Sequence, residues 1–597
     1  MQLKFKDNFV GYFQFYYKVV GNKLILSIIL SVTVSFLDGI GLSMLMPLLQ
    51  AVSGGEENTG KSMGKLHYVV DGLKKMGLPL TLTTVLGTLV VIFFMKGFAK
   101  FRELNYQARV TQFFMKRIRH LLVSSLQKIS YKGFIELDAG KIQNTFIAEV
   151  QRMSQAVRFY LNYTRALFML LTYVFLALLA NWQFAFLVGI SAGLTNLLYT
   201  RIYKRMKKNS LEISKKGHDF NSYMIQAIHY FKYLKSTNYL VSYSRKLGEV
   251  INTTENLNRK TAYYAAVTTG IREPMILLIV VVVIYIQINW MGGNIGSIIL
   301  SLILFYRALT FLMDIQNQWQ SFIVNTGAMR TVGDLSDLMY NNIEVMGTTD
   351  FKSVQNNISI ENVDISYGSN KVLSNVNINI PKNKTIALVG ASGSGKTTLA
   401  NVIMALITPD TGKVLVDGIP INQYNLNNYR SKIGYISQDS VIFNDNIYNN
   451  ITFWAEESPE NVKRFWKVIK MASLEDFVKN QPAQERTKLG DNGILISGGQ
   501  KQRISIAREM YKQAEILILD EATSALDSET EHIIQENIEN LHGRYTMIVI
   551  AHRLSTIKNV DTIYLLEKGS VNISGDFDTM LQNSDQFKRM VSLQGLL

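Results

Sequence analysis

The sequence contains no cysteine, and only eight of its 597 residues are proline. The missing cysteine excludes disulfide bonds, cysteine-ligated zinc, iron–sulfur clusters and thiol nucleophiles. Few prolines and little low complexity argue against a long disordered chain, and the length indicates several folding units. Apolar residues make up 48% of the chain and charged residues 18%. The mean hydropathy of +0.09 is high for a soluble protein, yet too low for a chain that lies wholly in a membrane.

The net charge of +16 is distributed unevenly along the chain. Residues 1–350 hold 37 Lys and Arg against 19 Asp and Glu, whereas residues 351–597 hold 25 against 27. A basic excess favours contact with nucleic acid or with a membrane surface. Because the basic excess lies entirely in residues 1–350, the sequence around those basic residues must decide between nucleic acid and a membrane surface.

Six apolar stretches in the first part are candidates for membrane spans. They cover residues 24–50, 78–99, 159–180, 184–200, 275–289 and 297–313. A helix needs about 20 apolar residues to cross the hydrocarbon core, and the first three stretches meet that length. The later stretches are shorter, but brief uncharged turns separate them in pairs, so we expect six spans.

The basic residues predict the orientation of these spans. Segments 101–158 and 201–260 carry 10 and 13 Lys and Arg, whereas turns 181–183 and 290–296 carry none. Positive charge collects on the cytoplasmic side, so we expect both termini in the cytoplasm. The densest basic run, Arg201 to Lys208, adjoins a span end. That position favours an orientation signal, and we expect no nucleic-acid partner.

We expect four parts in the chain. They are an interfacial N-terminal helix at 1–22, a transmembrane domain with six spans and long cytoplasmic helices at 23–325, a linker at 326–355 and a nucleotide-binding domain at 356–597. The aromatic N-terminal helix could instead pack on the bundle. An apolar stripe from Met63 to Met76 predicts an outer amphipathic helix that packs on the bundle or touches lipid.

The second part carries a phosphate-binding loop. Residues 357–367 and 372–380 alternate like antiparallel strands, and the buried strand 385–389 leads into GASGSGKTT and an apolar helix. Glycines let backbone N–H groups close around phosphates, and the helix N-terminus adds its positive end. The candidate ATP-binding residues are Gly390, Ser392, Gly393, Ser394, Gly395, Lys396, Thr397 and Thr398. Lys396 is expected to reach the β- and γ-phosphates, and the Thr397 hydroxyl to bind Mg²⁺.

Two further patterns accompany the loop. The apolar run 516–519 predicts a buried parallel strand that ends at Asp520, a candidate Mg²⁺ ligand, and at Glu521, a candidate base for the attacking water. Ser497, Gly498, Gly499 and Gln500 open a helix and form a candidate second anion site.

Together these motifs resemble an ABC transporter half-unit of the exporter type. The resemblance covers roughly residues 20–590 and includes Gln438 in IGYISQ, the SALD sequence that ends at Asp527, and His552 in IAHRLS. It implies an α-helical six-span transmembrane domain followed by an α/β P-loop ATPase domain. It also implies a homodimer, with ATP and Mg²⁺ as cofactors.

The resemblance further implies roles for single residues. Tyr367 would stack on adenine, Gln438 would contact Mg²⁺ or the attacking water, and His552 would hold the γ-phosphate and Glu521. Ser497 and Gly499 would touch ATP bound to the other subunit, and Asp527 would couple the two sites.

The chain departs from the family pattern at two places. Ile496 stands where leucine is usual, and Lys488 with Asp491 replaces a pair of glutamates. The second departure puts the detailed coupling contacts in doubt and leaves the ATPase assignment unchanged.

The candidate substrate residues are Lys96, Arg272 and Arg307, with Arg165 as a fourth, because charges near spans are costly and often functional. Asp38 could be a partner for one of them. A basic cavity suits a phosphate or pyrophosphate headgroup.

Short matches at 35–37, 46–47 and 306–307 resemble lipid-linked oligosaccharide flippases. We therefore expect export or flipping of a lipid-linked anionic molecule, with membrane lipid as a partner. A multidrug or peptide exporter and a membrane regulator without transport are the alternatives. The layout favours a bacterial inner membrane.

Overall fold

The computed structural model describes residues 3, 5–44, 47–48, 81–180, 182–289, 295–520, 536, 539, 541–551 and 553–594. It divides into two compact units, one of residues 1–129 and 133–343 and the other of residues 130–132 and 344–597. The outer segment with the Met63 to Met76 stripe lies outside the described residues.

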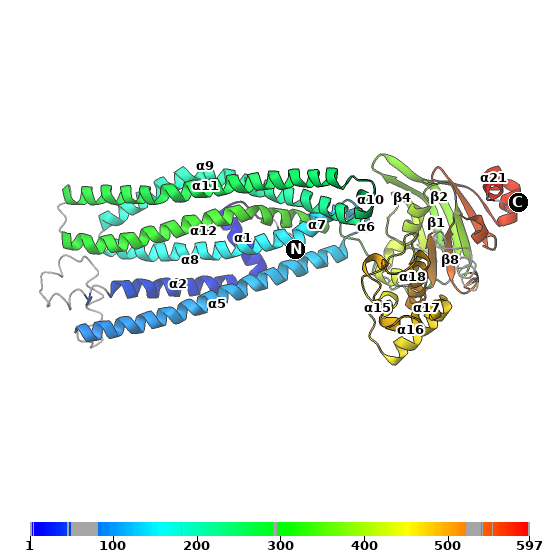
Figure 1. Ribbon diagram of the computed structural model, residues 1–597, viewed down its shortest axis with the longest axis horizontal. Coiled ribbons are helices and arrows are strands. Elements are labelled where there is room, and N and C mark those ends of the chain that lie inside the picture. The colour runs from blue at the N-terminus through cyan, green and yellow to red at the C-terminus, as the bar shows by residue number, and fades with distance from the viewer. Residues whose placement is uncertain are drawn as a thin grey trace. The chain divides into compact units, whose positions relative to one another are not determined.

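The first unit is helical (Figure 1). Its elements are α1 (Phe9–Val20), α2 (Asn22–Ser43), α5 (Leu82–Lys128), α7 (Ala139–Asn144), the π-helix η3 (Thr145–Glu149), α8 (Val150–Ala180), α9 (Trp182–His229), α10 (Phe231–Ser236), α11 (Leu240–Asn289) and α12 (Ile295–Asn341). The short helix α6 (Tyr131–Ile135) follows α5. At 1.5 Å per residue, the 48 residues of α9 extend about 72 Å, more than twice the thickness of a hydrocarbon core.

Three of these helices are long and apolar enough to cross a membrane, by length and composition. The candidate spans are Asn22–Ser43, Leu82–Lys128 and Ala139–Leu179, where only the described residues were searched. They correspond to the first three expected spans, although the first helix ends at Ser43 and not at residue 50. Helices α9, α11 and α12 run through the other three segments, and six spans stay a prediction.

The N-terminal helix packs its aromatic face into the bundle. Tyr12, Phe15 and Tyr16 are almost fully buried and join one apolar cluster with α5, α8 and α12. Asn8 caps the helix by accepting a hydrogen bond from the Gly11 amide at 2.7 Å. Phe9 and Tyr17 stay exposed at 38% and 41%. The structure therefore favours the packed arrangement that the sequence left open.

A buried polar network joins three of the long helices. The Arg152 guanidinium on α8 donates to Glu149 at 3.2 Å, to the Ser214 hydroxyl on α9 at 2.8 Å and to the Val324 carbonyl on α12 at 3.1 Å. Ser210 on α9 also donates to the Val324 carbonyl at 2.6 Å. Because a buried charge is stable only when it is paired and hydrogen-bonded, this network fixes the three helices together at one level.

The last helix of the first unit is longer than the sequence suggested. We expected a linker at 326–355, but α12 continues to Asn341. Ala328, Met329, Val332, Leu335 and Met339 all have 0% exposure and recur at helical spacing. This apolar stripe holds residues 326–341 in the bundle.

The second unit contains two sheets. An antiparallel sheet has the order β2-β1-β4-β5, and a six-stranded sheet has the order β10-β9-β3-β8-β7-β6. The strands are β1 (Asn357–Tyr367), β2 (Asn370–Pro381), β3 (Thr385–Val389), β4 (Thr411–Val416), β5 (Ile419–Pro420), β6 (Ile433–Ile436), β7 (Ile516–Asp520), β8 (Thr546–Ile550), β9 (Thr562–Glu567) and β10 (Ser570–Gly575). Strand β3 is parallel to β8 and β9, and β7 is parallel to β6 and β8.

Helices cover these sheets and continue from their strands. The longer ones are α13 (Lys396–Ile403), α16 (Pro459–Met471), α18 (Gly498–Lys512) and α21 (Asp585–Leu593). The shorter ones are α14 (Leu426–Ser431), α15 (Ile447–Thr452), α17 (Glu475–Lys479) and α20 (Phe577–Asn583). Every side chain of β3 and β7 is buried, as expected for parallel strands covered on both faces.

Candidate ATP site and membrane charge cluster

The loop between β3 and α13 has a backbone that only glycine adopts easily. Gly390, Gly393 and Gly395 have φ values of 156°, 79° and 104°. A Cβ at Gly390 would lie 2.3 Å from the Leu566 carbonyl oxygen, and one at Gly395 would lie 2.6 Å from a Leu373 methyl group. Both contacts are too short for a real side chain, so the loop requires glycine at these positions.

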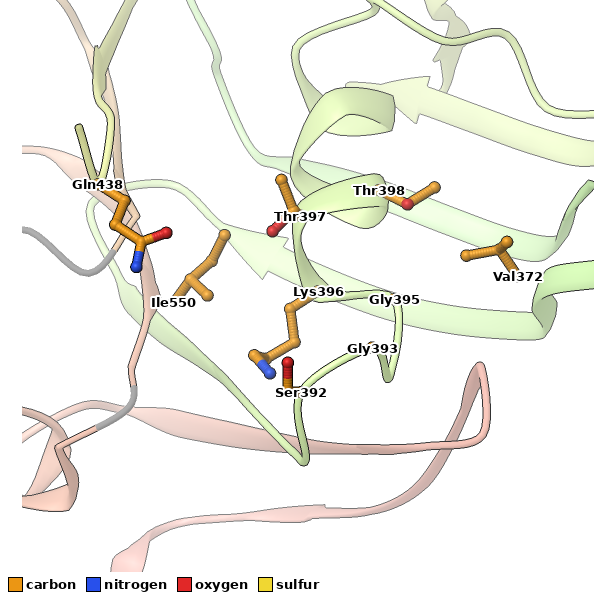
Figure 2. A pocket seen from close by; sticks show the side chains of 9 residues that line it. All are labelled: Val372, Ser392, Gly393, Gly395, Lys396, Thr397, Thr398, Gln438 and Ile550. Atoms are coloured by element: carbon orange, nitrogen blue, oxygen red, sulfur yellow. The ribbon is translucent and has the colours of Figure 1, made fainter. Parts of the chain in front are cut away.

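Lys396 is held across the loop that it follows. Its side chain is 6% exposed, and Nζ donates to the carbonyl oxygens of Gly390 and Ala391 at 2.8 and 2.9 Å. Figure 2 shows this side chain beside Ser392. The ammonium is therefore already positioned over the loop, where it can act on a bound phosphate as a point charge.

A buried hydroxyl group in the same loop lacks a partner. Ser394 is 6% exposed, and its Oγ makes no hydrogen bond within the described residues. A buried polar group without a partner costs free energy. A phosphate oxygen in the loop would satisfy this hydroxyl, so the local chemistry fits a nucleotide.

A cavity of about 400 Å³ opens over the loop. It is lined by Val372, Ser392, Gly393, Gly395, Lys396, Thr397, Thr398, Gln438 and Ile550. Figure 2 shows Gln438 on the opposite side of the cavity from Thr397 and Lys396. The structure thus brings the predicted loop residues together with Gln438, which lies 42 residues further along the chain.

Parallel strands place Asp520 and Gln438 at the same edge of the sheet. Asp520 ends β7 and is 6% exposed, and Gln438 follows β6, the strand paired with β7. The Tyr435 hydroxyl donates to Asp520 Oδ2 at 3.3 Å. Burial, together with the charge and hydrogen bond of Asp520, raises the pKa of Tyr435 to about 12. The phenol therefore stays a neutral donor that orients the carboxylate.

The residues at this edge suit Mg²⁺. The Thr397 hydroxyl, the Asp520 carboxylate and the Gln438 amide oxygen are hard oxygen donors, which Mg²⁺ prefers. The described residues contain no group of three or more His, Cys, Asp and Glu that could hold a metal. One carboxylate with few other protein ligands is the usual arrangement when Mg²⁺ is shared with phosphates.

The second anion motif forms the start of α18. The Ser497 hydroxyl accepts from the Gln500 amide at 3.2 Å, and the Gln500 side chain accepts from the Ser497 amide at 2.9 Å. This reciprocal pair is a capping box. Ser497 and Gly498 are exposed, and none of the residues from Ser497 to Gln500 lines the cavity over the loop.

The remaining candidate ATP residues are placed only in part. Tyr367 ends β1 with 42% exposure and is not among the residues that line the cavity. Glu521, Asp527 and His552 lie outside the described residues. The sequence did not single out Val372 and Ile550, which line the cavity, or Tyr435, which contacts Asp520. In the sequence, only their position near the ends of predicted strands could have indicated that these residues lie at the site.

In the membrane domain, charged residues of separate helices meet around Asp38. Lys96 on α5 forms an ion pair with Asp38 on α2, and the Tyr173 hydroxyl on α8 donates to Asp38 at 2.8 Å. Arg307 on α12 is exposed and acts electrostatically on Tyr173. The structure thus pairs one candidate substrate residue, Lys96, with a carboxylate. The side chain of Arg272 lies outside the described side chains.

Comparison with known proteins gives a family for the ATPase domain and a fold for the whole chain. Residues 373–524 match the family model described as ABC transporter. A solved structure titled as a bacterial Atm1-family ABC exporter with ATP bound superposes with a TM-score of 0.78 over 96% of this chain and 99% of that one, at 21% identity.

The ATPase domain matches the ABC transporter family, and the chain as a whole has the fold of an ABC exporter half-unit. It joins a helical N-terminal domain to an ABC ATPase domain. The chain is an integral membrane protein, and its second unit contains a nucleotide-binding ABC ATPase domain.

Curated proteins that are similar to this chain carry different names. The heterocyst differentiation ATP-binding protein HepA of Nostoc sp. is 27% identical over 96% of this chain and 93% of that protein. The ATP-dependent lipid A-core flippase of Desulfotalea psychrophila is 28% identical over 85% of this chain and 89% of that protein. The flippase of the same name from Pseudoalteromonas translucida is 43% identical over 42% of this chain and 43% of that protein.

Proposed function

We propose that two copies of this half-unit form a transporter that uses ATP hydrolysis to flip a lipid-linked anionic molecule across a bacterial inner membrane. The observation that carries the lipid assignment is the similarity to lipid A-core flippases over 85% of the chain. Asp38, Lys96 and Arg307 on the membrane helices together carry one net positive charge, which supports binding of a phosphorylated headgroup.

The dimer follows from the separation of the two anion sites. The exposed capping box at Ser497 lies apart from the cavity over the phosphate loop of the same chain. In this proposal it contacts ATP held by the partner subunit, and Gly498, Gly499 and Gln500 present the first turn of α18 to the γ-phosphate. Each ATP site is then complete only in the dimer.

The residues of one ATP site have separate roles. Lys396 and the loop amides bind the phosphates, and the Ser394 hydroxyl gains a partner when ATP enters. Mg²⁺, held by Thr397, Gln438 and Asp520, would supply charge neutralisation on the phosphates. Tyr435 keeps the Asp520 carboxylate oriented through its 3.3 Å hydrogen bond.

Three residues outside the described part complete the proposed mechanism. Glu521 accepts a proton from the attacking water, and His552 holds the γ-phosphate beside it. Asp527 couples the two sites of the dimer. ATP binding closes the ATPase domains and opens the membrane cavity outward, and hydrolysis resets it, with both termini in the cytoplasm.

The ATPase assignment is tested with Glu521→Gln in purified full-length protein. Loss of a positioned general base lowers turnover by about 10²- to 10⁴-fold, while ATP binding persists because the loop is intact. Full turnover in this variant would contradict the role of Glu521. Asp520→Asn is the comparison: because Asp520 is a proposed Mg²⁺ ligand, it should weaken the Mg²⁺ dependence of ATP binding as well as turnover, whereas Glu521→Gln should lower turnover alone.

The substrate assignment is tested by transport into proteoliposomes. We expect a lipid-linked glycan to stimulate ATP turnover and to be moved, and a panel of hydrophobic drugs to do neither. Stimulation by drugs alone would favour a multidrug exporter, and ATP hydrolysis without movement of any substrate would favour a regulator. Neutralisation of Lys96, Arg272 and Arg307 in parallel shows whether these charges act on the substrate.

A further inference from the structure

A basic pocket lies between α9 and α11 in the membrane unit. Its volume is about 500 Å³, and its walls carry the cations Arg205, Lys208, Arg259 and Lys260 together with Asn209 and two tyrosines. The members come from two segments about fifty residues apart in the sequence. We call this set the basic pocket.

The four cations of the basic pocket have no carboxylate partner among the described residues. Neighbouring cations on the same helix are neutralised, since Lys207 pairs with Asp7 at 3.0 Å and Lys216 with Asp219 at 2.9 Å. Four like charges around one cavity repel each other. Other cations on these helices, such as Lys204, also have no ion pair among the described residues, but the pocket gathers four of them around one cavity, and that arrangement favours a bound anion.

The acidic residues nearest in sequence do not neutralise the pocket. Glu212 lies one turn from Lys208, and Glu255 one turn from Arg259, but neither forms an ion pair with a pocket cation among the described residues. Glu255 instead accepts from the Asn258 amide at 3.2 Å. The positive charge of the pocket is thus not neutralised, although two carboxylates lie within one helical turn of its cations.

The walls of the pocket are fixed by packing between the two helices. The Asn209 amide on α9 donates to the Thr261 hydroxyl on α11 at 3.2 Å. Within α11, the rings of the neighbouring residues Tyr263 and Tyr264 lie with their centroids 6.1 Å apart. Arginine forks, lysine ammonium groups and tyrosine hydroxyls are the donors that bind phosphoryl oxygens, and phenol rings also suit the boundary between lipid and water.

The pocket lies close to the expected membrane surface. Residues 205–209 follow the predicted span end at residue 200 by about 8 to 14 Å along the helix. The polar headgroup region adds about 5 to 7 Å on each side of the hydrocarbon core. On α11, residues 259–264 precede the expected span start at residue 275 by 11 to 16 residues, about 17 to 24 Å along the helix. The α9 side of the pocket therefore begins just beyond the headgroup region, where long lysine and arginine side chains can extend to a lipid phosphate. The α11 side lies further into the cytoplasm, where a soluble phosphate also reaches it.

We propose that the basic pocket binds a phosphoryl group, as a phosphomonoester or pyrophosphate, and that a lipid headgroup carries it. The site is separate from the Asp38, Lys96 and Arg307 cluster, which lies within the predicted spans. The assignment of the basic pocket to the cytoplasmic side of the membrane depends on the proposed orientation, with both termini in the cytoplasm. Binding itself does not depend on what the dimer transports, so it can fail or succeed independently of the proposed function.

The test compares two charge-matched double variants of the full-length protein. Lys208→Gln/Arg259→Gln removes one lysine of α9 and one arginine of α11 from the pocket. Lys204→Gln/Arg245→Gln removes the same residue types from the same helices at exposed positions that do not line it. ATP turnover without substrate serves as the folding check for both.

Two probes distinguish the source of the phosphoryl group. Inorganic pyrophosphate is titrated onto protein in phosphatidylcholine nanodiscs, and retention of phosphatidic acid is measured by native mass spectrometry after purification from mixed vesicles. We expect the pocket variant to lose at least tenfold in affinity for phosphatidic acid, whereas the control variant keeps the wild-type value. Two surface ion pairs of about 0.7 kcal/mol each give this factor.

Each outcome decides the proposal. Selective loss of phosphatidic acid in the pocket variant supports a lipid headgroup. Selective loss of pyrophosphate binding without lipid retention keeps the phosphoryl site and overturns the lipid source. Equal losses in both variants, or no binding of either probe to the wild type, would overturn the site, because the cations would then act only as general surface charge.

Discussion

The ion pair between Asp38 and Lys96 permits a quantitative test of the membrane domain. The two side chains are 12% and 24% exposed, and Tyr173 also donates to Asp38 at 2.8 Å. Asp38→Asn keeps the size of the side chain and a hydrogen-bond acceptor for Tyr173. It leaves the Lys96 ammonium without its counter-ion in an apolar part of α5.

The expected cost follows from the burial of the pair. Two unit charges about 4 Å apart attract by about 4 kcal/mol at an effective dielectric constant near 20. Loss of one partner of a buried pair costs about 3–5 kcal/mol. Because Lys96 lies near the end of the expected span 78–99, its long side chain can extend to the membrane surface, and we expect Asp38→Asn to lower the free energy of unfolding by about 2 kcal/mol.

A double-mutant cycle measures this coupling. Asp38→Asn, Lys96→Gln and the double variant are unfolded reversibly in mixed micelles and followed by circular dichroism. We expect the double variant to be more stable than Asp38→Asn, with a coupling energy of about 2 kcal/mol. Lys100→Gln, one turn further along α5 and exposed, is the control and should be neutral.

The cycle can refute the reasoning directly. Distant, independent sites add to within about 0.5 kcal/mol. A coupling energy below that value would mean that Asp38 and Lys96 do not stabilise each other. Equal destabilisation by Lys100→Gln would mean that any charge removed from α5 has the same effect.

Three further predictions concern the ATPase domain. Gly390→Ala should abolish ATP binding in an equilibrium titration, because its Cβ would lie 2.3 Å from the Leu566 carbonyl oxygen; wild-type affinity would contradict this loop geometry. Lys396→Met should weaken ATP binding at least tenfold, since it removes the buried ammonium over the loop, and an unchanged dissociation constant would exclude that role. The folded-state pKa of Tyr435, about 12, exceeds the ordinary value near 10, so the stability this group contributes below pH 10 is lost as pH rises from about 10 to 12. Tyr435→Phe should therefore show a smaller loss of stability over that range in pH-dependent unfolding, and an identical slope would contradict the burial of the phenol.

The phosphate loop could be predicted from sequence because its determinants are local. Strand, loop and helix follow one another within residues 385–403, and the glycines require their conformations whatever surrounds them. The start of α18 is local in the same sense, since Ser497 and Gln500 cap each other within one turn.

Contacts between distant segments could not be predicted in this way. The choice of Lys96 as the partner of Asp38 depends on α2 and α5 lying together. The basic pocket depends on the register between α9 and α11, which Asn209 and Thr261 show. The extension of α12 to Asn341 was missed because polar residues such as Asp334 and Asp337 interrupt a stripe whose burial only the bundle determines.

The hydrogen bonds of Arg152 have a mechanical consequence. They clamp α8, α9 and α12 at the level of Ser210 and Val324, so a tilt of one helix there would carry the other two with it, as one lever. From Ser210 to His229, where α9 ends, the lever arm is about 29 Å long. A rotation of about 5° at the clamp then displaces the end of α9, and the attached α10, by about 2.5 Å.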